Sequence, residues 1–224
     1  MIVQDGMRRM HQEQEDVYYY LTVMNENYAH PAMPKGAEAG IIKGMYLFSE
    51  GGKGKGEGKK PTVQLLGSGT ILRESIAAAE MLEKDFGVAA DVWSVTSFNE
   101  LRREGLDAER WNMLHPEAKP RISYVEECLG KRSGPVIAST DYMKSYADQI
   151  RGFLPKRFKV LGTDGFGRSD TRKKLRGFFE VDRNYITVAA LKALADDGTI
   201  AASEVTRAIK LYKLNPEKPN PTTV

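Results

Sequence analysis

The chain has 224 residues, of which 41% are hydrophobic and 28% are charged, and a formal net charge of +3; this is the composition of an ordinary globular protein. Residues 51–60 hold four lysines and one glutamate and therefore carry the whole excess of positive charge. The remainder is close to neutral, which argues against a nucleic-acid-binding protein with a broad basic face.

The single cysteine, Cys128, can form neither an internal disulfide nor a cysteine-rich metal site, which indicates a reduced, cytoplasmic protein. No apolar run is long enough for a membrane span, and the polar N-terminal stretch does not resemble a signal peptide. None of His11, His30 and His115 has another histidine or a cysteine at metal-ligand spacing. We expect His115 to pack or to cap a helix.

The first part of the chain contains both regular elements and breaks. Residues 1–14 have an apolar side, like the end of an amphipathic helix, and the continuous apolar run 17–24 predicts a strand buried on both faces. After a loop broken by prolines, we expect a short helix at 37–44 and a short strand at 45–48. Residues 51–61 predict a flexible linker, because glycine and like charges oppose ordering and the P-loop spacing is not satisfied.

Strands and helices alternate in the rest of the chain. We expect strands at 62–67, 90–98, 135–140 and 158–163. We expect helices at 72–86, 142–153, 182–196 and 203–213, a basic helix after Asp170, and helical pieces within 99–116. Such alternation predicts right-handed βαβ units, and so a three-layer α/β fold with a mostly parallel sheet and helices on both faces.

The turn Gly67-Ser68-Gly69 joins a predicted strand to a predicted helix, and backbone N–H groups at such a helix start can bind an anion. A dinucleotide fingerprint needs a third glycine, but this position is Leu72. The acidic residue that the fingerprint also needs is present as Asp91. The pattern therefore leaves two interpretations, a nucleotide site or a plain turn between strand and helix.

A polar loop follows the predicted strand at 17–24. Ligands of parallel α/β sheets bind beyond the carboxyl ends of the strands, so a loop in this place is a candidate site. The alternative is a loop that only satisfies its own backbone. The candidate residues are Asn25, Glu26, Asn27 and Tyr28.

Residues 160–179, VLGTDGFGRSDTRKKLRGFF, end a strand, turn at Gly165 and Gly167, and begin a basic helix. We expect Ser169 or Asp170 to cap that helix. Cations in the first turn oppose the helix dipole unless an anion or a partner's carboxylates lie nearby. The residues themselves leave an anion site and a protein–protein contact equally open. The residues of this candidate turn are Asp164, Phe166, Arg168, Asp170 and Arg172.

Five stretches together resemble the transketolase-like, thiamine diphosphate-dependent enzymes and, within them, the homodimeric pyruvate dehydrogenase components. The stretches are chemically unusual, follow one order and cover nearly the whole chain. They are YYYLTVMNENYAHPAMPKGAEAGI, VQLLGSGTILRE, DVWSVTSFNELRREGLDAERWNMLHP, VIASTDYMKSYADQIR and VLGTDGFGRSDTRKKLRGFFEVDRNYITVAALKALA. The Gly/Lys-rich stretch at 51–60 is longer and more charged than this family pattern, but it falls where a linker is expected.

The resemblance implies a domain layout. Residues 1–50 would be the end of the aminopyrimidine-binding domain, 51–61 a linker, and 62–224 a transketolase-like C-terminal domain. The family's diphosphate signature, its activating glutamate and its active-site histidines are not found, which implies a C-terminal portion with no catalytic, cofactor-binding or metal-binding residues of its own. The Asn25–Tyr28 loop would lie near the active-site funnel, and the turn at 164–170 would form an interface.

The resemblance also implies the reaction of the complete enzyme. Such enzymes use thiamine diphosphate and Mg²⁺ to decarboxylate pyruvate oxidatively and to acetylate the lipoyl group of an acetyltransferase core. The expected partners are a homodimer mate, the N-terminal domains of the same enzyme and that core, whereas nucleic acid and membranes are not expected. Two rival hypotheses are a free-standing Rossmann-like module that binds a nucleotide or phosphate, and a structural or regulatory domain derived from the enzyme.

Overall fold

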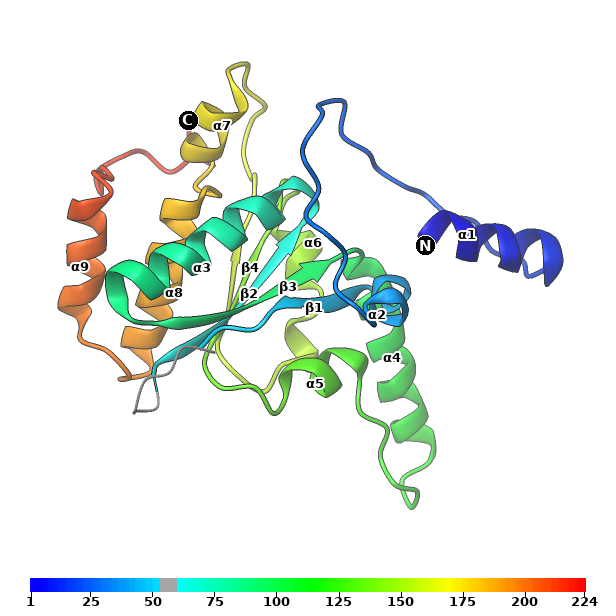
Figure 1. The fold of residues 1–224 in the computed structure, drawn as a ribbon. Coiled ribbons are helices and arrows are strands. Elements are labelled where there is room, and N and C mark those ends of the chain that lie inside the picture. The colour runs from blue at the N-terminus through cyan, green and yellow to red at the C-terminus, as the bar shows by residue number, and fades with distance from the viewer. Residues whose placement is uncertain (53–59) are drawn as a thin grey trace.

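The computed structural model describes residues 1–52 and 60–224 (Figure 1). Within them, five strands form one sheet in the order β1-β3-β2-β4-β5, in which β1 is antiparallel to β3 and the other neighbours are parallel. The strands are β1 (Met45–Ser49), β2 (Thr62–Ser68), β3 (Ala89–Val95), β4 (Val136–Ser139) and β5 (Phe158–Leu161). The predicted mostly parallel sheet is confirmed. The predicted linker falls largely on 53–59, outside the described residues.

Helices cover both faces of the sheet, which confirms the predicted three layers. One face is covered by α3 (Leu72–Phe86), α8 (Arg183–Asp196) and α9 (Ala202–Leu211), and the other by α4 (Phe98–Leu114), α5 (Tyr124–Leu129) and α6 (Lys144–Asp148). The other helical elements are α1 (Ile2–Met7), a π-helical turn (Arg8–Gln12), α2 (Glu38–Lys43), 3₁₀ turns at Gly69–Ile71 and Arg151–Phe153, and α7 (Arg172–Phe178). Figure 1 shows α1 away from the sheet, at the end of an extended segment. None of the helices in the described part of the chain is long and apolar enough to cross a bilayer.

Strand β2 contributes to two separate cores. Val63 and Leu65 pack beneath α3 and α8, whereas Leu66 packs on the α4 side, because successive side chains of a strand face opposite sides of the sheet. All three side chains are fully buried. A central strand of such a sheet must be largely apolar on both faces, and this is the pattern by which the sequence predicts a strand at 62–67.

Helices α3 and α8 have the limits that the sequence predicts. Gly87 ends α3 in the left-handed region, at φ 63°, and its N–H donates to the carbonyl of Glu83 at 3.1 Å. Asp182 begins α8, and its carboxylate accepts two backbone N–H groups of the first turn at 3.0 and 3.1 Å. Local capping chemistry therefore sets these boundaries.

The prediction of a strand at 17–24 is wrong. The segment is extended but pairs with no strand of the described residues, and Tyr18, Tyr20 and Val23 are 88%, 85% and 90% exposed. An apolar run indicates a tendency to be buried, but a strand also needs a neighbouring strand for its backbone hydrogen bonds. The described part of the chain supplies no such neighbour.

Residues 98–114 form one helix, not the separate pieces that the sequence predicts. Ser97 caps α4 by accepting a hydrogen bond from the N–H of Glu100 at 3.1 Å. Gly105 is buried because the Phe153 ring packs on it, so that a Cβ at this position would lie 2.6 Å from the ring. Small residues make up half of the buried face and weaken its apolar pattern. The buried residues are Phe98, Leu101, Gly105 and Ala108.

Three other helix starts differ from the predictions. The helix predicted at 142–153 begins at Lys144, after a loop in which the Thr140 hydroxyl accepts the N–H of Tyr142 at 3.2 Å, and it is divided into α6 and a separate 3₁₀ turn. Thr171, and not Ser169 or Asp170, caps α7. Helix α9 begins at Ala202, one residue before the predicted start at 203.

Candidate functional site

The loop that carries Asn25 and Glu26 lies against the start of α7. Arg172, the first residue of α7, donates from Nη2 to Asn25 Oδ1 at 2.9 Å. Its Nε forms an ion pair with the Glu26 carboxylate. The two candidate segments that the sequence indicates separately, the 25–28 loop and the basic helix after Asp170, are therefore in contact.

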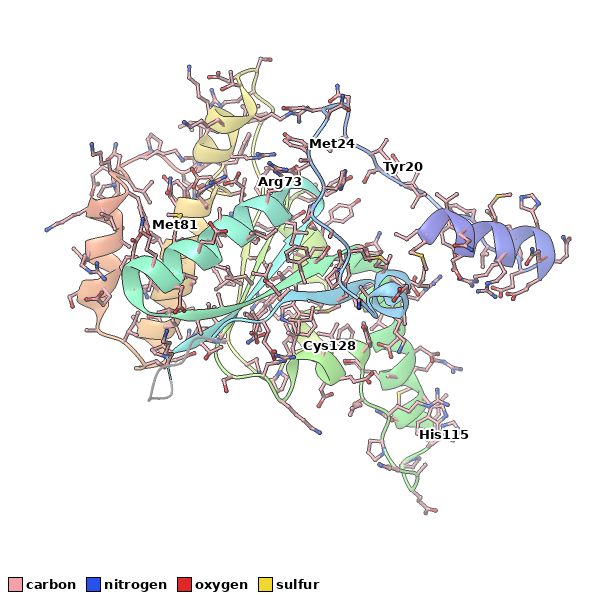
Figure 2. The ribbon with its side chains drawn as sticks, viewed as in Figure 1. Tyr20, Met24, Arg73, Met81, His115 and Cys128 are labelled. Atoms are coloured by element: carbon pink, nitrogen blue, oxygen red, sulfur yellow. The ribbon has the colours of Figure 1, made fainter. Side chains whose placement is uncertain are left out.

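The other end of this loop lies against the start of α3. Arg73 Nη1 donates to the carbonyl oxygen of Ala29 at 2.8 Å, and the guanidinium lies 4.9 Å from the centre of the Tyr28 ring. The Tyr28 hydroxyl donates to Glu26 Oε2 at 3.1 Å. Figure 2 shows Arg73 at the start of α3, close to the loop that follows Met24. The loop is thus held from two helices of the α/β domain.

Protein side chains occupy the Gly67-Ser68-Gly69 turn at the carboxyl end of β2. Ser68 Oγ donates to Thr140 Oγ1 at 2.8 Å, and Thr70 Oγ1 donates to Asp141 Oδ2 at 2.7 Å. A carboxylate beside the start of the helix repels a phosphate that would bind there. The geometry therefore favours a plain turn over a nucleotide site.

Asp91 lies far from that turn. It pairs with Gln64 in the β2–β3 ladder, whereas the residue opposite Ser68, at the carboxyl end, is Val95. The Asp91 carboxylate accepts hydrogen bonds from Gln64 Nε2 at 2.9 Å and from the N–H of Gly51 at 3.0 Å. A nucleotide ribose needs its acidic partner at the carboxyl end of the sheet. Asp91 therefore belongs to a buried polar network and cannot complete the fingerprint.

In the turn at 164–170, the charged side chains have partners within the chain. Asp164 Oδ1 accepts the N–H of Lys144 at 3.0 Å, and the Arg168 guanidinium lies 4.6 Å from the centre of the Phe178 ring. Asp170 Oδ1 accepts the N–H of Thr171 at 2.7 Å. These contacts leave Phe166, which is 79% exposed, as the apolar side chain at the tip of the turn.

The C-terminal tail packs against the base of this turn. Gly165 has φ +112°, and a Cβ there would collide with the carbonyl oxygen of Pro221. A left-handed glycine is needed at this position both for its backbone angle and for this close approach.

A buried ion cluster lies behind the carboxyl edge, and sequence reasoning missed it. Glu74 of α3 is 7% exposed and accepts hydrogen bonds from Arg183 Nε at 2.8 Å, Nη2 at 3.1 Å and N at 3.1 Å. Arg176 Nη1 lies 3.5 Å from Glu74 Oε1, and its Nη2 donates to Thr70. A glutamate in the first turn of a helix is common, so no local pattern distinguishes it.

The cluster lowers the pKa of Glu74. Burial acts to raise that pKa, but the hydrogen bonds and positive charge of Arg183, together with the charge of Arg176, outweigh it. The carboxylate is therefore ionised and ties the start of α3 to the start of α8. We assign it a structural role, because its partners Arg176 and Arg183 connect α3 to α7 and α8.

Cys128 and His115 each contact an aromatic side chain four residues earlier in the chain. Burial raises the pKa of the Cys128 thiol, an effect that the Tyr124 hydrogen bond only partly opposes, so the thiolate is disfavoured. His115 is exposed, stacks on Trp111 with 4.4 Å between ring centres and is the C-cap residue of α4, so it takes the capping position and not a buried one. His11 and His30 are exposed as well.

The residues present do not fit the diphosphate and magnesium of thiamine diphosphate. Magnesium binding requires several oxygen ligands around one point, and the described residues contain no group of three or more His, Cys, Asp or Glu side chains so arranged. The glycine turn that could receive a diphosphate faces Asp141. We therefore assign no step of a reaction to these residues through that coenzyme.

A mostly parallel sheet between two helical layers, with its polar turns at the carboxyl edge, defines an α/β domain of the three-layer class. The family model "Transketolase-like TK C-terminal domain" matches residues 44–182, and "Pyruvate dehydrogenase E1 component middle domain" matches residues 1–31. The first match covers more than half of the chain. The chain therefore belongs to the transketolase-like C-terminal domain family.

Comparison with individual proteins shows which members of this family the chain resembles. The pyruvate dehydrogenase E1 component of Pseudomonas aeruginosa is 65% identical over 222 residues, which are 99% of this chain and 25% of that protein. The E1 components of Cupriavidus necator and Escherichia coli are 62% and 53% identical over 100% and 99% of this chain, which amount to 25% and 24% of those proteins. The resemblance to pyruvate dehydrogenase E1 components is confirmed, and the chain spans about a quarter of the length of these relatives.

Proposed function

We propose that these residues are the C-terminal part of a homodimeric, acetyl-transferring pyruvate dehydrogenase. The complete enzyme decarboxylates pyruvate oxidatively with thiamine diphosphate and Mg²⁺ and acetylates the lipoyl group of an acetyltransferase core. The observation that carries the proposal is the identity of 65% along 99% of the chain, together with consecutive matches to a middle domain and a C-terminal domain. Its partners are a homodimer mate, the remaining domains of the enzyme and the acetyltransferase core.

The proposed division into domains follows from the resemblance. Residues 1–50 form the end of the aminopyrimidine-binding domain, 51–61 a linker, and 62–224 the C-terminal domain. The match to the middle-domain model ends at residue 31, and the match to the C-terminal model begins at residue 44, before the proposed boundary. Strand β1 lies within that second match and pairs with β3, so residues 45–49 belong to the same sheet as the strands after residue 62. The linker assignment rests on composition.

Exposed apolar side chains in the first 24 residues support this division. Val3 and Met7 of α1 are 63% and 52% exposed, and the extended segment adds Tyr18, Tyr20 and Val23. Large apolar side chains that are exposed along one segment indicate a surface that another part of a protein covers. The missing strands of the aminopyrimidine-binding domain are the partner that an apolar extended segment needs.

The proposal gives the chain a structural role within the enzyme. The Asn25–Tyr28 loop lies at the active-site funnel, and the turn with Asp164, Phe166, Arg168 and Asp170 contributes to an interface between domains or subunits. The exposed ring of Phe166 supports a contact, and the internal pairing of the neighbouring charges argues against a phosphate site. The coenzyme is held by other segments.

The test compares this chain alone with the same chain joined to the other segments of its parent enzyme. We expect pyruvate turnover with thiamine diphosphate and Mg²⁺ only in the second case. Calorimetry of the chain with thiamine diphosphate, NAD and ATP should show no binding. Turnover by the chain alone would overturn the structural role, and tight binding of ATP or NAD would favour a nucleotide-binding module.

A further inference from the structure

Arg73 and Arg172 hold opposite ends of one irregular loop. Arg172 contacts the side chains of Asn25 and Glu26, and Arg73 contacts the Ala29 carbonyl oxygen and the face of the Tyr28 ring. These contacts join residues that are 147 and 44 positions apart in the chain. Both arginines lie in the first turn of a helix, so the positions from which they reach the loop are set by the α/β domain.

The contact with Glu26 also explains the cation at the start of α7. A positive charge in the first turn opposes the helix dipole and costs a few tenths of a kcal/mol unless an anion lies nearby. The Glu26 carboxylate, paired with Arg172 Nε, is such an anion. An arginine that is unfavourable for its own helix is therefore favourable for the contact between helix and loop.

The planar guanidinium suits this contact. Its donors bind two acceptors in a fixed geometry, and its face stacks on aromatic rings, whereas a lysine ammonium is a flexible point charge. Arg172 uses separate nitrogens for the Asn25 amide oxygen and the Glu26 carboxylate. Because Asn25 Oδ1 accepts this bond, the contact favours one orientation of the exposed side-chain amide.

We infer that Arg73 and Arg172 are positioning residues that hold the Asn25–Tyr28 loop in one conformation at the carboxyl edge of the sheet. Their effect on catalysis rests on the proposed function, which places this loop at the active-site funnel. Their effect on the loop itself does not depend on that proposal. The two effects are therefore measured separately, in the parent enzyme with all of its domains.

The first measurement is the rate at which chymotrypsin cleaves after Tyr28, followed by mass spectrometry. Cleavage requires the loop to open, so its rate follows the open population when opening is fast. With both arginines replaced by alanine, we expect cleavage about 10-fold faster, since exposed ion pairs and cation–π contacts are each modest. An increase of less than about 2-fold would overturn the inference.

Arg207→Ala is the matched control. Arg207 donates to the carbonyl oxygen of Asp85 at 2.8 Å, pairs with Glu204 and lies 4.2 Å from the centre of the Phe86 ring. It therefore makes the same kinds of contact as Arg73 and Arg172, but with other partners. We expect cleavage after Tyr28 to be unchanged in this variant. An equal acceleration would show general destabilisation and overturn the inference.

Exchanging the charges of Arg172 and Glu26 tests the same contact even where the alanine variants fold poorly. Arg172→Glu and Glu26→Arg should each accelerate cleavage, because each places like charges together. The double variant should return most of the way to the original rate. Failure of the double variant to recover, while both singles are fast, would overturn a direct contact between these side chains.

The second measurement is steady-state kinetics on pyruvate. We expect Arg172→Ala to raise KM or lower kcat about 3- to 10-fold at unchanged melting temperature, and Arg172→Lys to recover part of the loss. A loosened loop with unchanged kinetics would overturn the catalytic part of the inference. If the unaltered parent enzyme does not turn over pyruvate, the proposed function fails, whereas the cleavage measurement still decides whether the arginines hold the loop.

Discussion

Replacing Glu74 by alanine removes the acceptor that joins the starts of α3 and α8. The carboxylate accepts three hydrogen bonds from Arg183 and lies 3.5 Å from the Arg176 guanidinium. Alanine leaves both arginines without this counter-charge. The change therefore tests whether the buried cluster stabilises the domain or is merely accommodated by it.

The exposures of the partners set the expected magnitude. The side chain of Arg176 is 14% exposed, whereas that of Arg183 is 48% exposed and can turn toward water. Removing one partner of a fully buried ion pair costs about 3–5 kcal/mol. Because only Arg176 remains poorly solvated, we expect the free energy of unfolding to fall by about 2–3 kcal/mol.

Urea unfolding followed by circular dichroism measures this change, with Glu83→Ala as the control on the same helix. Glu83 pairs with Lys60 at the surface, so its loss should cost less than about 1 kcal/mol. A loss of less than about 1 kcal/mol for Glu74→Ala, at an unchanged slope with urea, would refute the reasoning.

Three further predictions concern pH, a cap and a glycine. Because the pKa of Glu74 lies below its ordinary value of 4.5, the stability that its carboxylate contributes should be fully present above pH 4.5 and be lost as the pH falls through the lowered pKa. Between pH 7 and pH 3, the urea midpoint of Glu74→Gln should therefore fall less than that of the unaltered protein. Asp182→Ala should cost about 1 kcal/mol of unfolding free energy through loss of the α8 cap; Asp182→Asn should cost less, because burial raises the pKa of this carboxyl and Asn keeps the acceptor. Gly134→Ala should lower the free energy of unfolding by more than about 2 kcal/mol, since φ is +82° and a Cβ would collide with the Thr62 carbonyl. Gly152→Ala is the control: its Cβ would meet no atom within 4 Å, so urea unfolding should show little change.

Elements with a strong local pattern could be predicted from the sequence. Helices α3 and α8 appear at or within one residue of the bounds that the pattern predicts, 72–86 and 182–196. The run at 17–24 has an equally strong pattern, but it forms no strand in the described residues. The difference is that helices and caps satisfy their backbone hydrogen bonds locally, whereas a strand depends on a neighbour from elsewhere in the chain.

The candidate site was predictable in its parts but not in its arrangement. The polar loop at 25–28 and the turn at 164–170 stand out because polar residues, glycines and charges follow apolar runs. Their roles at a funnel and at an interface remain predictions. That Arg172 meets Glu26, or that Arg73 stacks on Tyr28, could not be predicted, because both contacts join distant parts of the chain.

The sequence by itself determined the fold class, the order of the main strands and helices, and the resemblance to pyruvate dehydrogenase components, since these follow from local periodicity, capping and long matching strings. Only the tertiary structure decided that Asp91 and the glycine turn are too far apart for a nucleotide, that Glu74 is buried between arginines, and that two helix starts hold the Asn25–Tyr28 loop. The reason is physical: hydrogen bonds and ion pairs act over a few ångströms, and which distant residues come within that range depends on the path of the whole chain.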